Sequence, residues 1–93
     1  MQEPCQRIRQ KILRGEYFFS VHALEELEND NFTTDDAVHA ILNGEIVEKL
    51  TYDVRGTRYV ICGHALDKRL LETVCRFHPT SNLLIITCYE FFE

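Results

Sequence analysis

The chain has 93 residues, the size of one domain, and its hydrophobic content of 45% is ordinary for a protein that folds around a core. No apolar run is longer than that of residues 83–86, far below the roughly 20 residues that span a bilayer, so we expect no transmembrane helix. Acidic residues outnumber Lys and Arg by 15 to 10, which disfavours nucleic-acid binding except through a local basic surface. We expect a single domain over residues 1–93.

The first residues lack the apolar stretch of a signal peptide, which predicts a cytoplasmic protein. In a reducing cytosol we expect the four cysteines to remain free thiols. The sequence contains no CxxC or HxxxH pair and no glycine-rich phosphate loop. We therefore predict neither a metal site nor a bound cofactor.

Three helices are predicted in the first half of the chain. Residues 4–14 carry apolar side chains at helical spacing after a proline that suits a first helical turn. Ser20 is a candidate N-cap for a second helix, which we expect to end near residues 29–31. Thr33, followed by acidic residues, predicts the start of a third helix that closes at Gly44.

The second half of the chain has the composition of β-strands. Four segments, separated by turn residues, are predicted to be strands: residues 45–52, 57–64, 70–77 and 83–90. Connections this short favour antiparallel neighbours. The expected fold is α+β, with three N-terminal helices packed on one face of a four-stranded antiparallel meander.

Strand alternation predicts that the other face of this sheet is polar and partly open. In the third predicted strand, Glu72 and Arg76 point to the side opposite Leu71 and Cys75. We therefore expect a candidate site on the uncovered face.

His22 lies at the start of the second predicted helix, beside an aromatic run. The positive end of the helix dipole favours a neutral imidazole there, able to accept a proton. The alternative interpretation is that His22 only caps the helix or ties it to the sheet.

Four further residues complete the candidate site: Arg58, Glu72, Arg76 and Tyr89. A metal-independent ribonuclease needs a base for the 2′-hydroxyl, an acid for the leaving 5′-oxygen and a cation for the phosphate. His22 and Glu72 are candidate proton carriers, the two arginines are candidate phosphate ligands, and Tyr89 is expected to position the substrate. Opposite charges on neighbouring strands are also typical of solvated cross-strand pairs.

The order of several short motifs resembles a bacterial family of domains of unknown function, number 4258, whose members look like small toxins of the RelE and ParE kind. The motifs are residues 19–25 at a helix start, 43–45, 58–63 and 85–89. The resemblance covers roughly residues 6–90 and implies helices on a curved antiparallel sheet, with His22 as the signature histidine and Tyr89 as the tyrosine that ends the last strand. The chain departs from the family at Glu26, where a basic residue is common, and at Glu72, where a histidine is common.

This kinship implies RNA cleavage or gyrase inhibition as activities and an antitoxin-like protein as partner. The first hypothesis is thus a RelE-like endoribonuclease that acts through the open sheet face. The alternative is a non-catalytic protein-interaction module that keeps the fold, for which we expect an acidic or apolar open face. A small-ligand or nucleotide pocket is the least supported of the three.

Overall fold

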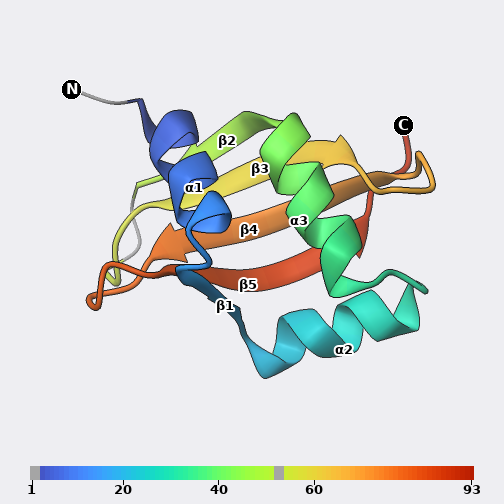
Figure 1. Ribbon diagram of the computed structural model, residues 1–93, viewed down its shortest axis with the longest axis horizontal. Coiled ribbons are helices and arrows are strands. Elements are labelled where there is room, and N and C mark those ends of the chain that lie inside the picture. The colour runs from blue at the N-terminus through green and yellow to red at the C-terminus, as the bar shows by residue number, and fades with distance from the viewer. Residues whose placement is uncertain (1–2, 52–53) are drawn as a thin grey trace.

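The computed structural model describes residues 3–51 and 54–93, which form three helices and five strands (Figure 1). In chain order the elements are α1 (Pro4–Leu13), β1 (Tyr17–Phe19), α2 (Val21–Asn29), α3 (Thr34–Asn43), β2 (Glu45–Leu50), β3 (Arg58–His64), β4 (Leu70–Phe77) and β5 (Leu83–Glu90). The α+β class and the three predicted helices are confirmed. Along the described residues, no helix is both long and apolar enough to pass through a membrane.

The sheet has the strand order β1-β5-β4-β3-β2. The last four strands of the chain are antiparallel neighbours, but β1 pairs with β5 in parallel, with Tyr17 beside Leu83 and Phe19 beside Ile85. The prediction of a four-stranded antiparallel meander is therefore corrected to a five-stranded mixed sheet. The aromatic run forms the extra strand because its alternate rings, Tyr17 and Phe19, pack against the core from this position.

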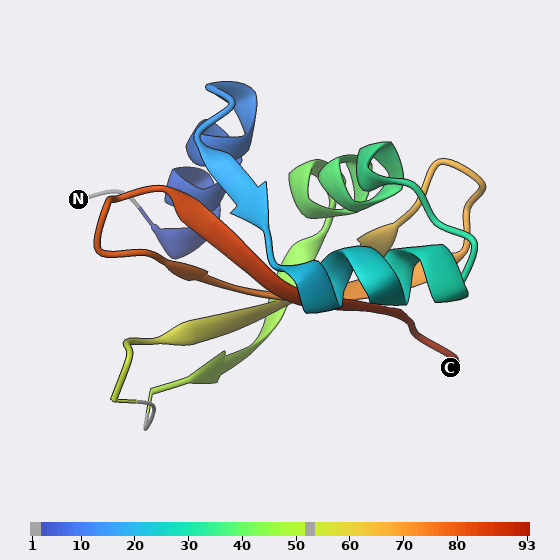
Figure 2. The ribbon, with the colours of Figure 1, turned by 90° about the horizontal axis from the view of Figure 1, so that it is seen from below.

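Helices α1 and α3 lie on one face of the sheet and α2 runs along its β5 edge, whereas the opposite face carries no helix (Figures 1 and 2). Beneath the helices, Leu71, Thr73 and Cys75 of β4 are completely buried. Helix α3 packs especially close to β3, because Gly63 has no side chain. A Cβ atom at this position would collide with the carbonyl oxygen of Ala40. The covered face therefore carries the core, and the alternate residues of each strand point to the open side.

Both α2 and α3 start at the predicted hydroxyl caps. Ser20 Oγ accepts a hydrogen bond from the Ala23 amide at 3.0 Å and donates one to the Ile86 carbonyl at 2.6 Å. Thr33 and Asp36 form a reciprocal capping box at the start of α3. The Ser20 side chain thus both begins α2 and fastens it to β5, which fixes the position of the residues that follow.

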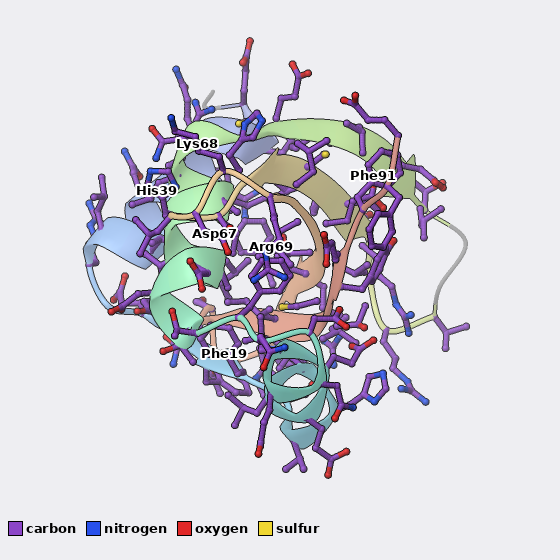
Figure 3. The ribbon with its side chains drawn as sticks, turned by 90° about the vertical axis from the view of Figure 1, so that its right-hand side faces the viewer. Phe19, His39, Asp67, Lys68, Arg69 and Phe91 are labelled. Atoms are coloured by element: carbon purple, nitrogen blue, oxygen red, sulfur yellow. The ribbon has the colours of Figure 1, made fainter. Side chains whose placement is uncertain are left out.

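Arg69 fastens the opposite end of the molecule, in the turn between β3 and β4. Its guanidinium donates to the carbonyl oxygens of Asp30 and Asn31 at 2.8 and 2.9 Å, and its Nε donates to Asp67 at 2.7 Å. It also lies 3.9 Å above the ring of Phe32. Figure 3 looks onto this end and shows Asp67 and Arg69 side by side. This arginine joins the α2–α3 connection to the sheet.

Candidate functional site

The open face of the sheet is organised in rows of side chains that run across the strands. Pairing between β3, β4 and β5 produces three successive rows, which contain Cys62, Glu72 and Tyr89, then Val60, Val74 and Thr87, then Arg58, Arg76 and Leu84. Successive rows are about 7 Å apart, since each strand residue advances about 3.3 Å. The middle row is mainly apolar, whereas the two outer rows carry the ionisable groups.

A tyrosine–carboxylate pair occupies the first row. The Tyr89 hydroxyl donates to Glu72 Oε1 at 2.6 Å. Burial, then this hydrogen bond, then the negative charges of Glu72, Glu48 and Glu26 raise the pKa of Tyr89 to about 12. The phenol therefore stays protonated at neutral pH and acts as a hydrogen-bond donor.

A histidine–carboxylate pair lies beside the middle row, where α2 runs along β5. Glu26 Oε1 accepts from the Thr87 hydroxyl and from the Cys88 amide at 3.1 Å, and His22 Nε2 lies 3.2 Å from the same oxygen. A carboxylate this close favours a proton on Nε2, which leaves Nδ1 as the basic nitrogen of the neutral imidazole. The His22 side chain is 67% exposed, which leaves the ring accessible to a ligand.

Two arginines occupy the third row. Arg58 precedes Tyr59 and Arg76 follows Cys75, and because Tyr59 and Cys75 are paired, the two arginines are neighbours on adjacent strands. Among the residues that the structure describes, Arg76 has no hydrogen-bond or ion-pair partner. Its charge is therefore free to meet an anion on the open face.

The structure places four of the five predicted site residues on the open face in two separate pairs, and it places His22 on α2, at the β5 edge of the sheet. Glu72 contacts Tyr89 directly, and Arg58 neighbours Arg76. Over residues 3–51 and 54–93, His22 makes no hydrogen bond or ion pair with any of these four. It reaches the face through Glu26 and Thr87, at the level of the row between Arg76 and Tyr89.

The model of a family described as Domain of unknown function (DUF4258) matches residues 19–90, well over half of the chain. The chain belongs to this family. Comparisons with curated proteins and with solved structures gave no match. The part matched by DUF4258 runs from β1 to β5 and includes every residue of the open face described above, whereas α1 lies outside it.

Glu26 is the member of this DUF4258 site that sequence reasoning missed. It was considered only as a departure from the family pattern, although His22 and Glu26 have the i, i+4 spacing that places two side chains together on a helix. The sequence carries no comparable signal for Thr87, because its contact with Glu26 joins segments that are distant in the chain.

The chemistry that this face offers is proton transfer next to cations. In the described part of the chain, no three His, Cys, Asp or Glu side chains converge as ligands for a metal ion. The groups at this face are an accessible imidazole backed by a carboxylate, a protonated phenol and the Arg76 guanidinium, with Arg58 as its neighbour. Such a set can move protons and neutralise a phosphate.

Proposed function

We propose that this chain is a RelE/ParE-like toxin-type domain of the cytoplasm that cleaves RNA without a metal ion, and that the open sheet face is its site. The observation that carries the proposal is the 3.2 Å contact between His22 and Glu26, one row from Arg76. A carboxylate behind a histidine fixes the tautomer and stabilises the imidazolium that forms when the ring accepts a proton.

The proposed reaction starts with the 2′-hydroxyl of the RNA. His22 Nδ1 takes its proton, and the resulting oxygen attacks the adjacent phosphorus. Arg76, with Arg58 beside it, neutralises the charge that builds on the non-bridging oxygens. The bond to the 5′-oxygen breaks, and that oxygen receives the Tyr89 proton, for which the hydroxyl turns from Glu72 to the leaving oxygen. The products are a 2′,3′-cyclic phosphate and a free 5′-hydroxyl. Solvent then restores the Tyr89 proton and removes the proton that His22 accepted, which returns both groups to their starting state.

The middle row and the first row of the open face have supporting roles in this proposal. Val60 and Val74 of the middle row are buried and separate the two charged rows. Glu72 holds the Tyr89 hydroxyl at 2.6 Å and so positions the proton donor. Toxins of this kind are held inactive by a protein partner, and we propose an antitoxin-like protein that covers the same face.

The test is cleavage of a labelled single-stranded RNA by the purified protein in the presence of EDTA. We expect His22→Ala to lower the rate by about 10²- to 10⁴-fold, the usual contribution of a general base, and Glu26→Gln to lower it by less. His64→Ala is the matched control. His64 is exposed like His22 but lies at the end of β3, so its substitution should leave the rate unchanged. Full activity in His22→Ala, loss of activity with EDTA, or no cleavage by the wild type would each refute the proposal.

A second candidate function is favoured by the acidity of the open face. Glu26, Glu48 and Glu72 all contribute to the raised pKa of Tyr89, so three carboxylates surround this hydroxyl. Two of them, Glu26 and Glu72, stand where the family resemblance leads one to expect basic side chains. A non-catalytic module that binds a basic segment of a protein partner would use such a face.

The same purified protein distinguishes the two candidates. An interaction module is expected to leave RNA intact and to bind an arginine-rich peptide, with affinity that falls in Glu48→Gln and Glu72→Gln. A ribonuclease is expected to lose activity in His22→Ala irrespective of peptide binding.

A further inference from the structure

A hollow lined by basic residues lies outside the open face, between α1 and the end of β4. Figure 1 shows α1 beside this end of β4. It has a volume of about 310 Å³ and is lined by Arg7, Gln10, Lys11, Arg14, Phe77, His78 and Ser81. Every charged residue in this lining is basic. The hollow is therefore an electropositive feature in a chain whose net charge is −5.

The spacing of the basic residues on α1 concentrates them in this hollow. Arg7, Lys11 and Arg14 follow one another at i, i+4 and i+7, which places them on one side of the helix. The buried Ile8 and Ile12 occupy the side that faces the core. Arg9 points elsewhere, and its guanidinium donates to the Leu42 and Gly44 carbonyls at 3.1 and 2.9 Å. One cation of the helix is thus structural, and three remain at the hollow.

Neighbouring groups hold these cations in place and leave most of their charge available. The Arg7 guanidinium lies 4.2 Å from the centre of the Phe77 ring, a cation–π contact that orients it without neutralising it. Lys11 has one acidic neighbour, Glu16, at 3.5 Å, and this carboxylate is itself 44% exposed. A partly exposed pair of this length gives little stabilisation and can exchange for a better anion.

His78 contributes a donor at the rim of the hollow. The Thr80 amide donates to His78 Nδ1 at 3.3 Å, so in the neutral ring Nε2 carries the proton. His78 also follows Arg76 by two residues, at the end of β4. The hollow and the third row of the open face therefore meet at the same end of the sheet.

From this arrangement we infer that the hollow is a second phosphate-binding site, which holds the backbone of an RNA strand where it continues past the open face around the end of the β4–β5 hairpin. The identity of the ligand as RNA rests on the proposed function, whereas the affinity for phosphate rests on Arg7, Lys11, Arg14 and His78. The helical residues of this lining precede the part matched by DUF4258, whereas Phe77, His78 and Ser81 lie within it.

The experiment measures binding of labelled 2′-O-methyl RNA, which cannot be cleaved, so that binding is read separately from catalysis. A strand of about eight nucleotides, within the usual site size of single-strand binders, is compared with a dinucleotide. We expect Lys11→Gln and Arg14→Gln each to weaken binding of the longer strand several-fold and to leave the dinucleotide unaffected. Each lost phosphate contact should lower the magnitude of the log affinity–log salt slope by about 0.7.

Lys68→Gln is the matched control, because Lys68 is an exposed lysine in the β3–β4 turn, at the other end of the sheet. An equal loss of RNA affinity in Lys68→Gln, or unchanged affinity in both Lys11→Gln and Arg14→Gln, would overturn the inference. So would polyglutamate that binds as tightly as the RNA strand and loses affinity in the same two variants. Weaker RNA binding in Lys11→Gln and Arg14→Gln supports the inference. If these variants bind less tightly but the wild type does not cleave RNA, the proposed function is refuted and the phosphate site remains.

Discussion

The two faces of the sheet are built from the same strands but depend on different physical interactions. On β4, Leu71 and Cys75 are completely buried under the helices, whereas Glu72 and Arg76 point to the open side. The covered face is held by close packing, where a change of volume is costly. The open face is held by a few hydrogen bonds among polar groups. Because single residues alternate between the two, stability and chemistry can be altered separately.

The largest expected difference between the faces is in stability. Leu71→Ala removes a fully buried side chain and should lower the free energy of unfolding by about 2–5 kcal/mol. The adjacent Glu72→Gln should change it by less than about 1 kcal/mol, because Glu72 is partly exposed. Urea denaturation of both variants measures the contrast. Similar losses in the two variants would contradict the separation of the faces.

A smaller effect is expected on the open face at alkaline pH. The fold raises the Tyr89 pKa from 10.0 to about 12, so the folded state retains a proton that the unfolded state releases above pH 10. This contribution to stability is complete below pH 10 and is lost as the pH rises to about 12. The stability advantage of the wild type over Tyr89→Phe should therefore shrink across this range.

Denaturation at several pH values tests the Tyr89 prediction, together with the ultraviolet absorbance of tyrosinate. Glu72→Gln should lower the Tyr89 pKa, since it removes one negative charge and weakens the hydrogen bond. If the difference in the free energy of unfolding between the wild type and Tyr89→Phe stays constant from pH 9 to 12, the fold does not raise the Tyr89 pKa.

The smallest effect is expected in the reactivity of the cysteines, which compares the accessibility of the covered face with that of the surface without any mutation. Burial raises the pKa of Cys75 and Cys88 to about 12, and both thiols are fully buried on the covered face. Cys5 and Cys62 are partly exposed. Iodoacetamide should modify Cys5 and Cys62 in the folded protein and reach the other two only after unfolding, as read by mass spectrometry. Early modification of Cys75 would mean that the covered face opens readily.

Local signals in the sequence predicted the elements that depend on near neighbours. Ser20 and Thr33 were identified as helix caps because a cap acts within three residues of itself. The alternation of Leu71 and Glu72 between the faces likewise follows from strand geometry alone. The α+β class was predictable for the same reason.

Contacts between distant segments were not predictable from these signals. Strand β1 has only three residues, and its parallel partner lies at the other end of the chain. Irregularities in pairing between Ile46 and Glu48, and between Val74 and Cys75, shift the register, so the rows of the open face could not be aligned from sequence. Arg58, Glu72, Arg76 and Tyr89 lie on the open face, but their pairing, the place of His22 on α2 and the part played by Glu26 required coordinates.

The parallel pairing of β1 with β5 has a consequence for biosynthesis. The hydrogen bond from Ser20 to Ile86 joins residues 66 positions apart, so on the ribosome this edge of the sheet has no neighbour until β5 has emerged. Closing so long a loop late delays completion of the fold. Strand β1 therefore cannot take its place in the sheet before β5 has been synthesised.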